Sequence, residues 1–164
     1  MIAIEKKSLS VGKFVTTQHV DNVIRNYKQE RWIQNSERLG KEDSLSAWWS
    51  VEELERFLDT AKLNGADGVK FYFGAYANDY TEQPEYAGLQ TLAMVATKQK
   101  EGANGTTVNK DLYVTGENGN TILGYNMAQL CPPMCGKGRS LNDSDYGEVG
   151  TIVIDRGDKG MMVI

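Results

Sequence analysis

The chain has 164 residues, of which 40% are hydrophobic and 24% are charged, and this composition excludes the disordered and fibrous classes. The formal net charge is −4 and the pI is about 5.1. Nucleic-acid-binding domains normally carry a basic stripe that replaces counterions on phosphate, so we expect neither nucleic acid nor an anionic membrane among the partners.

Three further features bear on location. No stretch approaches the ~20 apolar residues of a membrane span. The N-terminal residues lack the charged start and long apolar run of a secretory signal. Two cysteines in 164 residues do not make a disulfide framework. The sequence therefore predicts a cytoplasmic protein.

The first predicted element is a helix over residues 18–37. Thr16 or Thr17 can cap it, because a hydroxyl oxygen accepts from an unpaired backbone N–H. The apolar residues at helical spacing are Val20, Val23, Ile24 and Tyr27. This stripe fades after Tyr27, so we expect the distal part to be exposed or bent, with Gly40 as the end.

A second helix is predicted after Ser50. Ser50 and Glu53 have the spacing of a capping box, in which each side chain satisfies the other residue's backbone N–H. The expected buried stripe consists of Leu54, Phe57, Leu58 and Ala61. Trp49 precedes the cap, where it can pack on Leu54 as a hydrophobic staple, and Gly65 is the expected C-terminal cap.

Two strands are predicted next. Residues 69–76 are rich in strand-favouring aromatics, and Phe71 and Phe73 would lie on the same face, toward the core. Residues 89–97 are apolar on both faces, which is typical of a central strand. The simplest topology joins the two as an antiparallel pair through the loop 78–88.

The remaining residues predict short strands joined by turns. We expect residues 98–109 to form a loop. Asn118-Gly119 lies between the apolar runs 111–114 and 121–125, and this dipeptide is a hairpin signal because both residues tolerate positive φ. Residues 151–154 and 161–164 predict a terminal hairpin.

These elements predict an α+β fold with two N-terminal helices packed on a mainly antiparallel sheet. We expect a single domain over residues 1–164, with a helical part at about 16–64 and a sheet-rich part at about 68–164. The expected core includes Leu54, Phe57, Leu58, Phe71 and Phe73.

Four segments are distinctive: Ser46–Leu54 (SAWWSVEEL), Gly68–Tyr76 (GVKFYFGAY), Gln90–Leu92 (QTL) and Cys131–Cys135 (CPPMC). Together they resemble a family of small uncharacterised proteins of Bacteroidetes bacteria. The resemblance covers roughly residues 44–135. It implies a bacterial origin and supports a cytoplasmic location, but it implies no activity, cofactor or catalytic residue.

Cys131 and Cys135 are the first candidates for chemistry, as a thiol pair that binds metal or cycles with a disulfide. A structural zinc site normally needs four ligands, and the only histidine, His19, lies far away in the sequence. The spacing also differs from the Cys-x-x-Cys of thioredoxin-like centres. The alternative is a proline-stiffened loop whose cysteines pack or stay free.

Other possible sites match their motifs less well. A nucleophilic cysteine with His19 as its base lacks any protease-like sequence neighbourhood. Residues 142–148 resemble a calcium loop, but the glycine and the closing glutamate are misplaced. Residues 136–140 lack the spacing of a phosphate-binding P-loop. We therefore expect no cofactor.

Aromatic residues supply the remaining candidate site. Trp48, Tyr72 and Tyr76 exceed what a core requires, and exposed aromatics often mark a binding surface. The alternative is ordinary core packing, which we favour for Trp49 because of its place beside the capping box.

The sequence thus favours a non-enzymatic interaction protein that binds another protein through an aromatic, sheet-edge or loop surface. The alternative is a thiol-dependent metal or redox protein, or an enzyme, that uses Cys131 and Cys135. The oligomeric state is left open.

Overall fold

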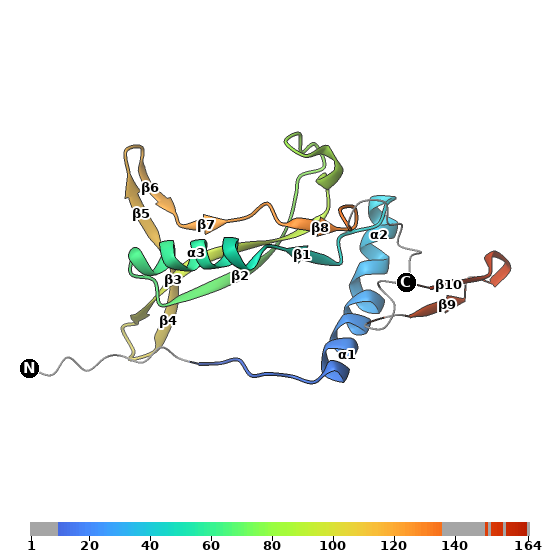
Figure 1. The fold of residues 1–164 in the computed structure, drawn as a ribbon, viewed down its shortest axis with the longest axis horizontal. Helices are drawn as coiled ribbons and strands as arrows, with labels where there is room; N and C mark the ends of the chain where they lie inside the picture. Colours follow the sequence, from blue (N-terminus) through green and yellow to red (C-terminus); the bar gives the residue numbers. More distant parts are fainter. Residues whose placement is uncertain (1–9, 136–149, 151, 156, 164) are drawn as a thin grey trace, which may run out of the picture. The chain divides into compact units, whose positions relative to one another are not determined.

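The computed structural model describes residues 10–135, 150, 152–155 and 157–163 (Figure 1). The chain divides into two compact units, each with its own internal contacts. Unit 1 contains residues Met1–Gly12, Trp48–Ala75 and Thr91–Ala128, and unit 2 contains Lys13–Ala47, Tyr76–Gln90 and Gln129–Ile164.

Unit 1 is built on the long strand β3 (Gln90–Glu101), which lies inside a four-stranded sheet. β4 (Thr107–Asp111) and β7 (Gly124–Tyr125) pair with β3 in antiparallel registers, Thr97 opposite Asp111 and Met94 opposite Tyr125. β2 (Gly68–Ala75) also pairs with β3. The middle of β3 is buried, as predicted for a central strand.

β2 runs antiparallel to β3. A Cβ on Gly68 would meet Thr97 at 2.8 Å, and a Cβ on Gly74 would meet Thr91 at 3.8 Å. The start of β2 thus lies beside the later part of β3 and the end of β2 beside its beginning. Because β3 has β2 on one side and β4 and β7 on the other, β2 is an outer strand of the described sheet.

Helix α3 (Val51–Leu63) packs against β7 in unit 1. The predicted capping box is confirmed: Ser50 Oγ accepts from the Glu53 amide, and the Ser50 amide donates to Glu53 Oε2 at 2.9 Å. Phe57 is buried and its ring lies 5.7 Å from that of Tyr125, whose hydroxyl donates to Glu53 Oε1. Leu58, expected in the core, is 40% exposed.

The glycine-rich part of unit 1 contains two antiparallel ribbons. β5 (Tyr113–Gly116) and β6 (Gly119–Ile122) form the hairpin that Asn118-Gly119 predicts, with Gly119 at a φ of 102°. The prediction of a loop over residues 98–109 is wrong, because β3 continues to Glu101 and pairs with β4. The polar side chains of these residues are compatible with the β3–β4 ribbon because most of them are exposed to solvent.

Unit 2 begins with one continuous helical rod. It comprises α1 (Thr17–Tyr27), a π-helical turn (Lys28–Trp32) and α2 (Ile33–Leu39), with Thr16 as N-cap and left-handed Gly40 as C-cap. The π turn starts where the apolar stripe ends. It brings Lys28 and Trp32 into buried positions, and burial lowers the pKa of Lys28.

The buried carboxylate of Asp43 organises unit 2. Oδ1 accepts from the amides of Gln90 (2.7 Å) and Ser44 (2.8 Å), and Oδ2 accepts from Asn35 Nδ2. The Asp43 carbonyl accepts from Trp32 Nε1, so the end of the rod and the start of β3 are tied to one residue. Tyr27 donates to Gln90 Oε1; burial, assisted by the Asp43 charge, raises the pKa of Tyr27 to about 12.

The other elements of unit 2 are short. β1 (Ser46–Trp48) pairs with β8 (Gln129–Cys131), and a 3₁₀ turn (Pro84–Tyr86) contributes the buried Tyr86. β9 (Val153–Asp155) and β10 (Met161–Val163) form the predicted terminal hairpin around a 3₁₀ turn (Gly157–Lys159).

The expected fold class is wrong. The described residues form several small antiparallel sheets, and strands outnumber helices. The two N-terminal helices do not pack together on one sheet: α3 clusters with the four-stranded sheet of unit 1, and the rod over residues 17–39 clusters with unit 2. Only Lys28 and Trp32, both in the π turn, are buried in the rod. The apolar stripe of the preceding helix therefore did not identify what the rod packs against.

Replacement of the Asp43 carboxylate tests its role in unit 2. We expect Asp43→Ala to lower the free energy of unfolding by about 3 kcal/mol, because it leaves buried donors without an acceptor. The exposed Asp79→Ala should change it by less than about 0.5 kcal/mol. Denaturant unfolding measures both, and the Gln90 amide should exchange faster only in the Asp43 variant. Equal stability of the two variants would contradict this role.

Candidate functional site

The outer strand β2 presents large aromatic side chains to solvent. Phe71 is 52% exposed and Phe73 is 83% exposed, although the sequence predicted both in the core. The prediction is wrong because alternation along the strand identifies a shared face but not a covering layer. Tyr72, on the opposite face, is 42% exposed. Three consecutive aromatics are therefore accessible on one strand.

The only charged side chain of β2 is drawn over the sheet. Lys70 Nζ lies 2.8 Å from Asp111 Oδ1 on β4, and the Tyr72 hydroxyl donates to Asp111 Oδ2 at 2.7 Å. The hydrogen bond to Asp111 raises the pKa of Lys70, and the hydrogen bonds from Lys70 and Tyr72 lower the pKa of Asp111. Charge is thus neutralised on the face of the sheet, and no unpaired charge is left along β2.

The two sides of this sheet differ in the residues that their outer strands carry. β4 carries exposed Asn109 and Lys110, which are the kind of residues that prevent one sheet edge from pairing with another. β2 has neither a proline nor a free lysine, and the common protective devices are missing from it. Of the described outer strands of this sheet, β2 is the one suited to accept another strand.

The predicted binding aromatics are divided between the two units. Trp48 (59% exposed) and Tyr72 belong to unit 1. Tyr76 belongs to unit 2, where its ring stacks on Tyr80 and Tyr86 at 4.5 and 5.8 Å. Trp49 is buried, as expected from its place beside the capping box. Phe71 and Phe73, assigned to the core, are exposed aromatics that sequence reasoning missed.

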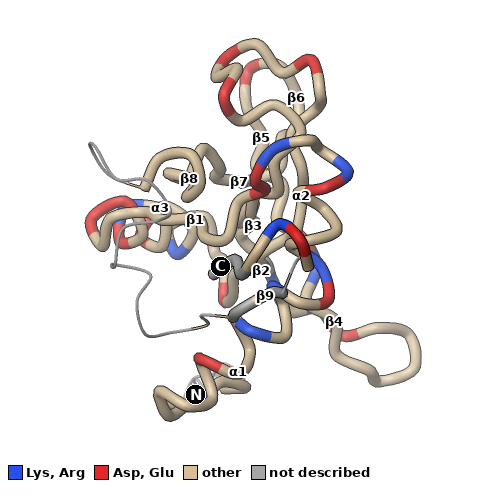
Figure 2. Tube along the Cα trace, turned by 90° about the vertical axis from the view of Figure 1, so that its right-hand side faces the viewer, with Lys and Arg blue, Asp and Glu red and all other residues tan. Residues whose placement is uncertain are grey.

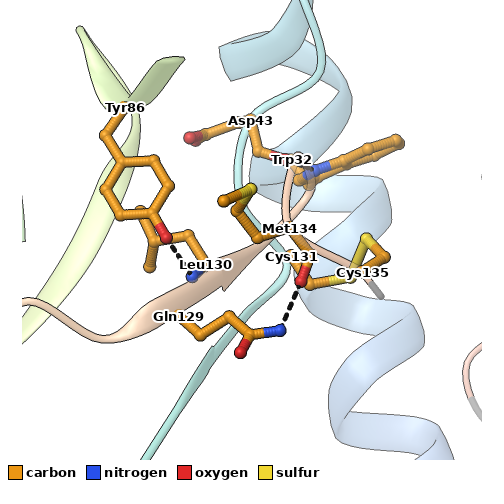
Figure 3. The surroundings of a disulfide bond; sticks show 8 residues. All are labelled: Trp32, Asp43, Tyr86, Gln129, Leu130, Cys131, Met134 and Cys135. Atoms are coloured by element: carbon orange, nitrogen blue, oxygen red, sulfur yellow. Dashed lines mark hydrogen bonds between the residues drawn. A yellow bond between two sulfur atoms is a disulfide. The ribbon is translucent and has the colours of Figure 1, made fainter. Parts of the chain in front are cut away.

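Cys131 and Cys135 form a disulfide that closes a five-residue loop after β8 (Figure 3). Backbone and side-chain hydrogen bonds hold the same loop: Met134 N–H donates to the Leu130 carbonyl, and Gln129 Nε2 donates to the Met134 carbonyl. The Tyr86 hydroxyl accepts from the Leu130 amide at 3.0 Å. The sequence left free, packed or bonded cysteines open, and the structure shows the bonded form.

The bonded form bears on the metal and nucleophile hypotheses. A thiolate is the species that ligates metal or attacks a substrate, and neither sulfur is a thiolate while the bond exists. The described residues contain no group of three or more metal-ligating side chains. His19 lies exposed in the first turn of α1. The candidate calcium and phosphate loops, residues 142–148 and 136–140, lie outside the described residues.

No protein-family model, curated protein or solved structure matches the chain. The resemblance to a Bacteroidetes family therefore stays a prediction. Among the described residues, no helix has the length and apolar character needed to cross a membrane. Lys and Arg positions are interspersed with Asp and Glu positions along the trace (Figure 2).

The ion pair across the sheet generates a test by pH. Because the folded pKa of Asp111 lies below 3.8, its contribution to stability is present above pH 3.8 and is lost as the pH falls through the folded value. The folded pKa of Lys70 lies above 10.5, so its contribution is present below pH 10.5 and is lost as the pH rises through the folded value. The pair is intact throughout the neutral range.

NMR titration of the Lys70 side chain measures this directly. We expect Asp111→Asn to lower the Lys70 pKa toward 10.5, and Tyr72→Phe to lower it less, because the hydrogen bond to Asp111 is the larger cause of the rise. An unchanged Lys70 titration in Asp111→Asn would show that the lysine is not held over the sheet.

Proposed function

We propose that this chain is a non-enzymatic protein-binding protein that accepts an extended segment of a partner along β2. The observation that carries the proposal is the coincidence of an outer strand with exposed Phe71 and Phe73 on one face and Tyr72 on the other. No cofactor is required for this role.

The physical basis is strand addition. An outer strand offers a row of backbone N–H and C=O groups that an extended peptide can pair with, and alternate side chains supply specificity. Phe71 and Phe73 would contribute apolar contact area, as aromatic residues do at the centre of protein interfaces. The partner segment best suited to this edge is extended, uncharged and apolar on one face.

Substitution of Phe73 tests the proposal. Because its side chain is 83% exposed, Phe73→Lys should fold normally, as checked by circular dichroism, and yet place a free charge at the edge. When it is used as bait in the native host, this variant should recover at least about tenfold less partner protein than wild type does. Tyr113→Lys, at a 61% exposed aromatic on β5 of the same unit, is the matched control. Equal partner recovery by wild type and Phe73→Lys would reject the β2 edge.

The disulfide supports a second candidate function, a redox-responsive thiol pair. Disulfides in cytoplasmic proteins are usually transient and catalytic or redox-sensing, whereas in oxidising compartments they persist as structural bonds. We retain the cytoplasm as the proposed location, and the redox candidate requires Cys131 and Cys135 to cycle there between bonded and reduced forms.

Thiol trapping in intact native cells tests this second candidate. Alkylation of the reduced cysteines before lysis should give a mixed population that shifts toward the dithiol when the cells are treated with a dithiol reductant. A bond that stays fully oxidised indicates a structural role and a compartment other than the cytoplasm. Partner binding that is unaltered in the Cys131→Ser/Cys135→Ser double variant would remove any regulatory role for the pair.

A further inference from the structure

We propose that the partner segment on β2 is the β2 strand of a second copy of this chain, so that two four-stranded sheets join edge to edge around a two-fold axis. This inference rests on the proposed function, because it uses the same edge. It adds the identity of the occupant and the geometry of pairing.

Charge is the first reason for a second copy. When two β2 strands approach each other, the lysine of one copy would normally lie close to the lysine of the other. Here Lys70 is tied to Asp111 within each copy, so two β2 strands meet without an unpaired charge along Gly68–Ala75. Like charges directly opposite each other destabilise a strand pair, and this edge avoids them.

The difference between the two outer strands is the second reason. If β2 paired with β4 of another copy, the assembly would always keep one free β2 at one end and one free β4 at the other, and it would grow into an open filament. Pairing of β2 with β2 uses the unprotected strand of each copy and leaves at the outside the two-residue β7 and the polar β4, with Lys110 and Asn109. The assembly closes at two copies.

The strand sequence also fits a two-fold register. An axis perpendicular to a continuous sheet keeps each side chain on its own face, so odd-numbered residues must oppose odd-numbered ones. A pairing centred on Tyr72 meets this condition and opposes Phe71 of each copy with Phe73 of the other. Cross-strand aromatic pairs of this kind stabilise antiparallel sheets. Lys70 then lies opposite Gly74, away from the second lysine.

Sedimentation equilibrium of the full chain tests the oligomeric state. We expect wild type to reach twice the 18.2 kDa chain mass with rising concentration. Phe73→Lys should raise the dissociation constant of the dimer at least about tenfold, and Tyr113→Lys should leave it unchanged. A wild type that stays at the mass of one chain, or a Phe73→Lys variant that dimerises like wild type, overturns the inference.

A cross-link tests the register without relying on affinity. Cβ atoms of directly opposed residues in an antiparallel pair are about 4.5–5.5 Å apart, within reach of a disulfide after small adjustment. Tyr72→Cys, at the proposed axis, should therefore give a covalent dimer on oxidation. Val108→Cys, at a similarly exposed position on β4, should stay single-chain. Cross-linking through Val108 but not through Tyr72 overturns the inference.

The two proposals can fail separately. If wild type is a single chain in solution but its bait loses a partner on Phe73→Lys substitution, the edge binds a different protein and only the second-copy inference fails. If Phe73→Lys changes neither the mass nor the partner recovery, the proposed function fails together with it.

Discussion

The position of β3 in the sheet is the constraint on which the accessible surface of unit 1 depends. β4 and β7 occupy one side of β3 in succession, and β2 occupies the other. Once both sides of β3 are filled, β2 has one hydrogen-bonded neighbour among the described strands and must lie outside. The outer position explains the unpaired backbone edge of β2, whereas the exposure of Phe71 and Phe73 reflects the absence, in the described part of the chain, of a layer that covers their face.

Asp43 has the corresponding role at the beginning of β3 in unit 2. Its carboxylate accepts from the Gln90 amide, and its carbonyl accepts from Trp32 at the end of the π turn. A buried carboxylate is costly unless its oxygens are hydrogen-bonded, and both Asp43 oxygens are. The network is therefore specific: it fixes where the rod ends and where the longest strand begins, which generic apolar packing would leave adjustable.

Local signals predicted local structure well, and the tertiary arrangement poorly. The Ser50–Glu53 capping box, the Gly40 cap and the Asn118-Gly119 hairpin each depend on residues close in the sequence, and all three are present. The core positions of Phe71, Phe73 and Leu58 depended on which layers cover them, which no periodicity encodes. The ion pair of Lys70 with Asp111 spans 41 residues, and no sequence signal identified it. The bond between Cys131 and Cys135 was one of several interpretations that the sequence left open, because spacing does not distinguish bonded from free cysteines.

The contact between Lys70 and Asp111 links the stability of the sheet to the availability of its edge. Lys70 reaches across β3 to a carboxylate on β4, so the ion pair ties together the two outer strands on one face. The same contact withdraws from the edge the only charge that could protect it. Phe71 and Phe73 lie on the opposite face, where that network cannot cover them. A lysine free at the edge of the sheet would repel the lysine of a second strand. A lysine held over the face of the sheet leaves the backbone groups of β2 accessible. The ion pair that joins β2 to β4 thus also leaves β2 without a free charge at its edge.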